Sequence, residues 1–181
     1  MKCKIFTLYI LSLISSFAVC QKAPTNVNEP CIIQADTVAI ASKLLTLTDA
    51  EKIMGEQAKL TCNTFIKKGD TMEYKCDYTA LLQDATTGKT GKLYFMYEIY
   101  GGVAAAANAY AAIYQANSRH EGVEVVSGLG DEAYYHTDRT GFYFFLVRKK
   151  EKMIRLKLNK VTSHSSVKEF KEATRHIVDS L

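Results

Sequence analysis

The sequence contains no tryptophan and only two prolines among its 181 residues. The lack of tryptophan counts against a sugar-binding platform, in which sugar rings stack on large aromatic side chains. The scarcity of proline leaves little room for a linker between two domains. After the first twenty residues, no stretch reaches the roughly 18 uninterrupted apolar residues that a membrane helix requires. We therefore expect one domain that is soluble or lipid-anchored.

Motifs for metal binding and nucleophilic catalysis are also missing. No C-x-x-C, H-x-H or H-x-x-x-H pair occurs, so the sequence predicts no metal site. There is no G-x-S-x-G motif, and the G-x-G at 128–130 lacks the third glycine and the following helix of a phosphate-binding loop. We expect no cofactor and favour a protein that is not an enzyme.

The first twenty residues predict an export signal. Lys2 and Lys4 precede an apolar run over residues 5–14, and small residues lead to Cys20. Two processing events compete there, because the chain is either cleaved after Cys20 or lipidated on it as a bacterial lipoprotein. The protein is therefore expected to be exported, and to be periplasmic, anchored to the outer membrane or extracellular.

The rest of the chain divides into a polar tether at 21–36 and a single domain at 37–181. Removing residues 1–20 removes two lysines and no acid, so the formal net charge falls from +4 to +2. That charge is too small to indicate nucleic-acid binding. The expected partner is a protein or an envelope ligand, with an anionic membrane surface as a further possibility.

Three cysteines remain between the signal and the chain end, in a compartment where disulfides persist. Cys62 and Cys76 flank a turn cluster, and a three-residue loop at 68–70 would place them opposite each other on paired strands. Directly opposed residues have Cβ atoms roughly 4.5–5.5 Å apart, which a bridge can accommodate. A two-residue loop would shift the register by one and prevent this bridge. We favour a Cys62–Cys76 disulfide, with Cys31 paired to either one as the alternative.

Apolar periodicity predicts an α+β fold with a mainly antiparallel sheet and all helices on one face. The layout is helix-βββ-helix-ββββ-helix. The expected helices are 37–47, a short helix capped by Thr48 and Glu51 and ended by Gly55, 103–118 and 166–181; the expected strands include 58–66, 71–81, 93–100, 123–126, 142–147 and 153–158. Two halves of similar layout meet at residues 127–136.

Residues 127–136 hold two glycines, adjacent carboxylates, two tyrosines and a histidine. A catalytic hypothesis combines Asp131, Glu132 and His136. Because neighbouring side chains of an extended segment point to opposite faces, the two carboxylates are expected to share no substrate. We favour a glycine-dependent corner in which Asp131 bonds its own backbone two residues on. The binding candidates in this segment are Tyr134, Tyr135 and His136.

Tyrosines recur along the predicted strands and on the helix 103–118. Tyr110 and Tyr114 stand four residues apart, and core packing explains this pair better than a ligand site. Six further tyrosines are candidates for an exposed, interaction-prone sheet face: Tyr94, Tyr97, Tyr100, Tyr134, Tyr135 and Tyr143.

A basic segment lies between Val147 and Lys160, with seven lysines and arginines against one glutamate. One interpretation is a site for an anionic partner such as lipid head groups. The other is a solvated hairpin whose charges protect an edge strand against pairing. The residues that would bind the anion are Arg148, Lys149, Lys150, Lys152 and Arg155.

Three short motifs suggest a family. These are the L-T-x-x-E pattern followed by glycine at 47–55, C-x-Y at 76–78 and G-L-G-D-E-A at 128–133. The region 44–181 resembles bacterial extracytoplasmic lipoproteins and sensor-like domains whose function is uncharacterised. The resemblance implies no catalytic residues. In many members a cysteine opens the first helix, whereas Cys31 here lies well before it.

Three functional hypotheses follow. The first is a non-enzymatic binding or interaction domain of the cell envelope. The second is a hydrolase-like enzyme that uses Asp131, Glu132 and His136, which requires these groups within hydrogen-bond reach in a pocket. The third is an envelope-assembly subunit that contacts anionic lipid through the basic hairpin at 148–160.

Overall fold

A computed structural model describes residues 40–181. The predicted signal peptide at 1–20, the tether at 21–36, and the sites at Cys20 and Cys31 lie outside the described residues. Residues 40–44, the end of the first expected helix, are helical. No helix among the described residues combines the length and apolar character needed to cross a membrane.

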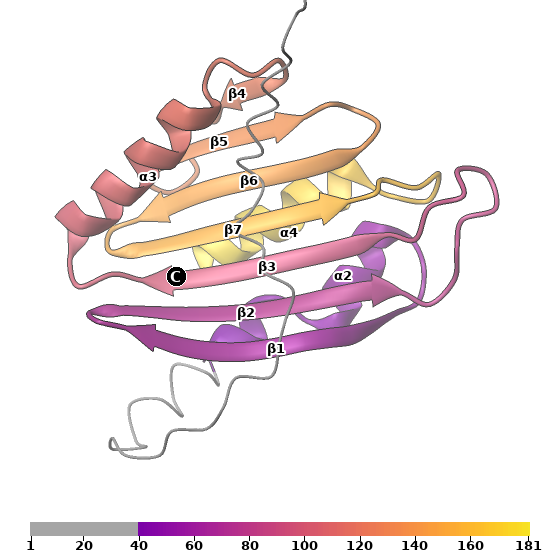
Figure 1. The fold of residues 1–181 in the computed structure, drawn as a ribbon, viewed down its shortest axis with the longest axis horizontal. Helices are drawn as coiled ribbons and strands as arrows, with labels where there is room; N and C mark the ends of the chain where they lie inside the picture. The colour runs from indigo at the N-terminus through magenta and orange to yellow at the C-terminus, as the bar shows by residue number, and fades with distance from the viewer. Residues whose placement is uncertain (1–39) are drawn as a thin grey trace, which may run out of the picture.

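Seven strands form one antiparallel sheet in the order β1-β2-β3-β7-β6-β5-β4 (Figure 1). The predicted α+β class with an antiparallel sheet is confirmed. The strands are β1 Ala58–Lys68, β2 Thr71–Ala80, β3 Lys92–Ile99, β4 Val123–Val125, β5 Glu132–Thr137, β6 Phe142–Lys149 and β7 Lys152–Asn159; the helices are α2 Leu47–Met54, α3 Val103–Asn117 and α4 Val167–Asp179.

The sheet consists of two meanders, each built from consecutive hairpins. β1, β2 and β3 form the first, and β4 to β7 form the second. They join where β3 pairs antiparallel with β7, with Phe95 opposite Leu156. The outer edges of the sheet are β1, which is eleven residues long, and β4, which has three.

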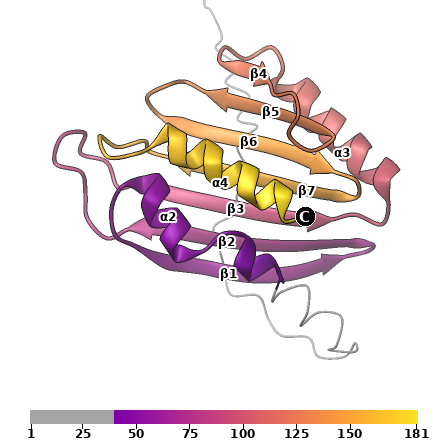
Figure 2. The same cartoon turned by 180° about the vertical axis from the view of Figure 1, so that it is seen from behind.

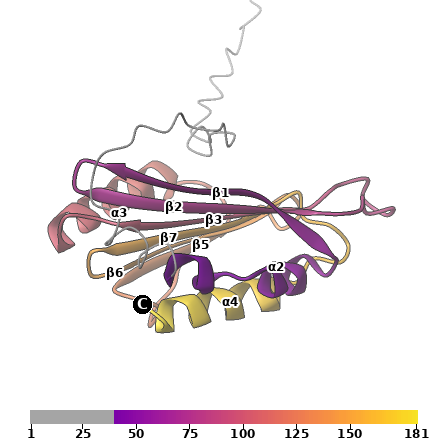
Figure 3. The ribbon, with the colours of Figure 1, turned by 90° about the horizontal axis from the view of Figure 1, so that it is seen from below.

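Helices cover both faces of the sheet, so the expectation that all helices share one face is wrong for α3. α2 and α4 pack on one face through Ile53, Phe170 and Ile177 (Figures 2 and 3). α3 packs on the other through Tyr110, against Tyr134, Leu146 and Met153. The reason is that β5, β6 and β7 are apolar on both sides, so a second helix finds a surface to bury.

The cap of α2 lies two residues earlier than predicted. The Thr46 hydroxyl accepts from the Asp49 amide at 3.2 Å, and the Thr46 amide donates to the Asp49 carboxylate at 3.0 Å. Glu51, the expected capping partner, instead accepts from the amide of Ala58. The helix does end at Gly55, whose φ of 70° is left-handed, as the sequence predicts.

The predicted Cys62–Cys76 bridge is wrong. Residues 69–70 form a two-residue turn that pairs Lys68 with Thr71, so Cys62 lies opposite Asp77. One step along β2, Cys76 therefore points to the opposite face from Cys62. Cys76 is a free thiol in the core, and burial raises its pKa to about 12.

Candidate functional site

A groove of about 420 Å³ lies between α3 and the segment that connects β4 to β5. We call it the tyrosine groove. Its volume falls within the roughly 300–1,000 Å³ of typical small-molecule sites. The residues that line it are Tyr110, Tyr114, Val125, Val126, Ser127, Gly128, Leu129, Gly130, Asp131, Glu132 and Ala133.

One side of the groove is built from stacked tyrosine rings. Tyr110 and Tyr114, one helical turn apart on α3, stack with centroids 6.2 Å apart and planes 14° apart. Both rings contact Tyr134 of β5, at 6.2 and 5.4 Å between centroids. Tyr110 is buried in the core beneath α3, and Tyr114 is half-buried. The predicted core packing is confirmed, and the same pair also faces the groove.

The other side of the groove is the predicted turn at residues 127–131. Gly130 has a φ of 65°, and a Cβ atom there would lie 2.5 Å from the carbonyl oxygen of Arg148. The turn is held against β6 because the amide of Asp131 donates to that same carbonyl at 2.8 Å. Only glycine allows so close an approach with this backbone conformation.

The two adjacent carboxylates share one partner, contrary to expectation. Arg148 Nε donates to Glu132 at 2.6 Å, and Arg148 Nη1 donates to Asp131 at 2.8 Å. Asp131 precedes the first residue of β5, so the alternation of an extended strand does not separate its side chain from that of Glu132. Asp131 also accepts from the amide of Lys150 at 2.6 Å, in place of the predicted bond to its own turn.

His136 is far from these carboxylates. It pairs with Phe144 on β6, whereas Glu132 pairs with Arg148, a separation of four residues or about 13 Å along the strand. Its ring contacts Phe142 and lies 5.8 Å from the ring of His120. Burial, and then the neighbouring His120, lower the pKa of His136. The geometry that the hydrolase hypothesis requires is absent.

The expected exposed tyrosine face is not formed by its main candidates. Tyr134 is fully buried, and Tyr135 and Tyr97 are nearly so. Tyr135 packs on Phe145 and Phe170 under α4, while Tyr134 packs under α3. The other three candidates, Tyr94, Tyr100 and Tyr143, are half-buried.

Most cations of the basic hairpin have partners within the protein. Lys149 and Lys152 donate to the carbonyl oxygens of Val178 and Leu181 at 2.8 and 2.7 Å. Arg155 forms an ion pair with Glu98 at 2.9 Å. Lys150 is exposed in the turn. The edge-strand interpretation is wrong, because β7 lies between β3 and β6 at the centre of the sheet.

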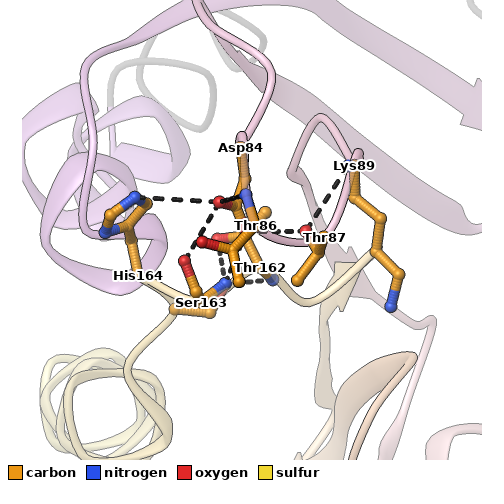
Figure 4. A network of polar contacts seen from close by, with 8 residues as sticks. Asp84, Thr86, Thr87, Lys89, Thr162, Ser163 and His164 are labelled. Carbon is orange, nitrogen blue, oxygen red and sulfur yellow. Dashed lines mark hydrogen bonds and ion pairs between the residues drawn. The ribbon is translucent and has the colours of Figure 1, made fainter.

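Asp84 forms a polar cluster that sequence reasoning missed (Figure 4). Its carboxylate accepts from the Ser163 amide at 2.7 Å, the Ser163 hydroxyl at 3.0 Å and the Thr87 hydroxyl at 2.6 Å. These bonds, with that from the Ser163 amide the strongest, hold the pKa of Asp84 well below its ordinary value. The available signal was Asp84 with Thr86 two residues later, which is typical of an Asx turn.

The Asp84 cluster is structural rather than catalytic. Ser163 donates its proton to Asp84, not to a histidine, and His164 Nε2 lies 3.9 Å from the carboxylate. A nucleophilic serine requires a base within hydrogen-bond reach of its own oxygen. Within residues 40–181, no group of three or more histidine, cysteine or acidic side chains is arranged to hold a metal ion.

No family model, no curated protein and no solved structure matches this chain. The resemblance to extracytoplasmic lipoproteins therefore stays a prediction.

Proposed function

We propose that this protein is an exported, non-enzymatic binding domain whose tyrosine groove takes a small amphipathic cation. The observation that carries the proposal is the combination of stacked rings on one side of the groove and two carboxylates on the other. Export itself rests on the sequence of residues 1–20.

The rings supply an apolar surface for the body of the ligand. Tyr114 is only half-buried, so its ring adjoins both Tyr110 and the open space of the groove. Aromatic faces attract cations as well as apolar groups, with about 0.5–1 kcal/mol at exposed sites and about 2 kcal/mol when the cation is desolvated.

The two carboxylates make one end of the groove negative, so the groove favours a positively charged ligand. The side chains of Asp131 and Glu132 are 43% and 41% exposed, while that of Arg148 is 10% exposed. One buried guanidinium against two carboxylates leaves one negative charge at this end of the groove. A ligand with a flat apolar body and one positive group therefore complements both sides.

The anionic-lipid hypothesis finds less support in the contacts of the hairpin. Lys149 and Lys152 direct their amines to the end of α4, and Arg148 and Arg155 are paired with carboxylates. Lys150 is the candidate that remains exposed in the turn. A single exposed lysine contributes about 1 kcal/mol to binding an anionic surface.

The test is an NMR titration of the exported chain with phenethylammonium chloride. We expect amide shifts confined to residues 110–114 and 125–133, with weaker binding of the uncharged 2-phenylethanol. Tyr114→Ala is expected to weaken binding about two- to fivefold, which corresponds to the 0.5–1 kcal/mol of one exposed cation–aromatic contact. Tyr94→Ala, a half-buried tyrosine outside the groove, serves as the matched control.

Thermal unfolding of both variants separates loss of binding from loss of the fold. Shifts elsewhere on the sheet, or equal binding of phenethylammonium by Tyr114→Ala and the parent protein, would contradict the proposal.

A further inference from the structure

We propose that His120 and His136 together bind a late first-row divalent metal ion, Zn²⁺ or Cu²⁺. His120 lies in the turn between α3 and β4, and His136 lies on β5. The centroids of their rings are 5.8 Å apart. Neither residue lines the tyrosine groove, so this inference is independent of the proposed function.

The separation of the two rings suits a shared metal ion. Metal–nitrogen bonds of about 2.0–2.1 Å in tetrahedral geometry put the centroids of two bound imidazoles about 5 Å apart. The separation in the protein is about 0.8 Å longer than that. Because the side chain of His120 is exposed, a small rotation of this side chain closes the difference.

Backbone hydrogen bonds hold the two histidines close together before a metal ion binds. The His120 amide donates to the carbonyl of Asn117 at the end of α3, at 2.9 Å. The Thr137 amide of β5 donates to the carbonyl of Gly122 at 3.1 Å. The turn then continues into β4, which pairs antiparallel with β5. The turn is therefore fixed to both α3 and β5, and little backbone freedom is lost when the metal ion binds.

The immediate surroundings of His136 also suit a metal ligand. Its ring hydrogen-bonds to the backbone of Glu121, in the same turn as His120. Metal-bound histidines usually donate their other ring N–H to such a backbone group, which fixes the orientation of the ring. Phe142 contacts the His136 ring edge to face, with centroids 4.9 Å apart, and limits its rotation.

The protein supplies two ligands, and water supplies the others. The charged groups that act on His136 besides His120 are Asp138 and Lys157. The Asp138 carboxylate already accepts from three backbone amides of its own turn, so it is not free to bind a metal ion. In the part of the chain that the structure describes, no three metal-binding side chains are grouped together. Imidazole nitrogens suit Zn²⁺ and Cu²⁺, whereas Mg²⁺ and Ca²⁺ prefer oxygen ligands.

The first experiment is a titration of the exported chain with zinc sulfate, followed by NMR of the histidine rings. We expect the ring signals of His120 and His136 to shift, and those of His164 and His176 to stay unchanged. His120→Gln is expected to weaken Zn²⁺ binding at least about tenfold, because loss of an outer-shell partner alone costs about 10–100-fold. His176→Gln, at an exposed position of α4, is the matched control and should bind Zn²⁺ as the parent protein does.

The identity of the metal ion is tested by competition in the same titration. Cu²⁺ should displace Zn²⁺ and broaden the ring signals of His120 and His136, because the affinity of nitrogen ligands is higher for Cu²⁺ than for Zn²⁺. Magnesium chloride at the same concentration should leave both rings unchanged. Equal shifts with Mg²⁺ and Zn²⁺ would contradict a site built from imidazoles.

Thermal unfolding gives a readout that does not depend on NMR. A metal ion that binds only the folded chain raises its Tm. Zinc sulfate should therefore raise the Tm of the parent protein and of His176→Gln, and should have much less effect on His120→Gln. Because His120 is exposed, the Tm of all three proteins without metal should be the same. Equal Zn²⁺ binding by His120→Gln and the parent protein, or no shift of either ring in the parent protein, would overturn the proposal.

Discussion

Gly130 joins the turn of the tyrosine groove to β6, and the backbone there tolerates no side chain. We expect Gly130→Ala to lower the free energy of unfolding by about 3 kcal/mol, the sum of left-handed strain and overpacking. Gly128 also has a positive φ but faces open space, so Gly128→Ala should cost only about 1 kcal/mol. Urea unfolding measures both, and equal losses would contradict the close approach to Arg148.

Asp77 makes stability depend on pH. Burial raises the pKa of its carboxyl to about 6, and Lys75 and Lys92 oppose that rise only in part. Because this pKa lies above the unfolded value of 3.8, the protonated carboxyl of Asp77 contributes to the stability of the folded protein. That contribution is fully present below about pH 4 and is lost as the pH rises through 6. Asp77→Asn removes the charge, so we expect it to be about 1–2 kcal/mol more stable than the parent at pH 8.

The comparison for Asp77→Asn is the same measurement at pH 4. There the carboxyl of the folded protein is protonated, and the gain over the parent protein should largely disappear. A gain of equal size at both pH values would show that packing, not ionisation, separates the two proteins.

Capping motifs show how far single residues can be predicted. Gly55 ends α2 as expected, and Ser166 caps α4 by accepting from the Glu169 amide. The start of α2 was mispredicted because Thr46 with Asp49 and Thr48 with Glu51 have the same spacing. Local pattern alone does not separate them. The burial of Leu45 just before the helix is a tertiary contact that favours the earlier start.

At the scale of elements, the basic hairpin stabilises α4. The amine of Lys149 binds the carbonyl oxygen of Val178 in the last turn of that helix, and the amine of Lys152 binds the oxygen of Leu181 just beyond it. A positive charge at this end also complements the helix dipole. We expect Lys149→Met and Lys152→Met each to destabilise the protein by about 0.3–1 kcal/mol, with faster hydrogen exchange in the last turn of α4. Lys168→Met, in the first turn, should have no such effect.

The hairpin also shows why the edge-strand interpretation of its charges is wrong. The sequence placed the cations correctly on a turn and two strands, since β6 and β7 are joined at Lys150 and Glu151. What periodicity cannot show is that β7 pairs with β3 from the other meander. That pairing puts the hairpin at the centre of the sheet.

α3 illustrates a similar limit. Its apolar stripe was predicted, and Tyr110 packs on the sheet as expected. The face on which it packs depends on how the chain crosses from β3 to β4, and both faces of β5 are apolar at Tyr134 and Tyr135. The tyrosine groove arises only from this choice of face, so no local pattern reveals it.

At the scale of the whole molecule, Asp84 joins two distant loops. It links the β2–β3 connection to the β7–α4 connection through Ser163. Its lowered pKa means that the stabilisation is present above the unfolded value of 3.8 and is lost as the pH falls below it. We expect Asp84→Asn to lower the urea midpoint at pH 7. Between pH 7 and pH 3, the urea midpoint of this variant should decrease less than that of the parent protein.

A matched control for Asp84→Asn is Asp70→Asn, at an exposed position in the turn between β1 and β2. That variant should have the same urea midpoint as the parent protein at pH 7. Its urea midpoint should also decrease as much as that of the parent protein between pH 7 and pH 3. If Asp84→Asn behaves in the same way, Asp84 does not hold the two loops together.

The order of the strands has a consequence for how the chain folds. Within each meander every strand pairs with its neighbour in sequence, and the only pairing between meanders is β3 with β7. Local pairings form faster than distant ones, because they close shorter loops. Each meander is thus able to assemble early, and the pairing of β3 with β7 forms last. A chain cut at Gly101–Gly102 would leave one meander on each fragment. Reassociation of the two fragments would depend on the pairing of β3 with β7 and on the contact of α2 with α4.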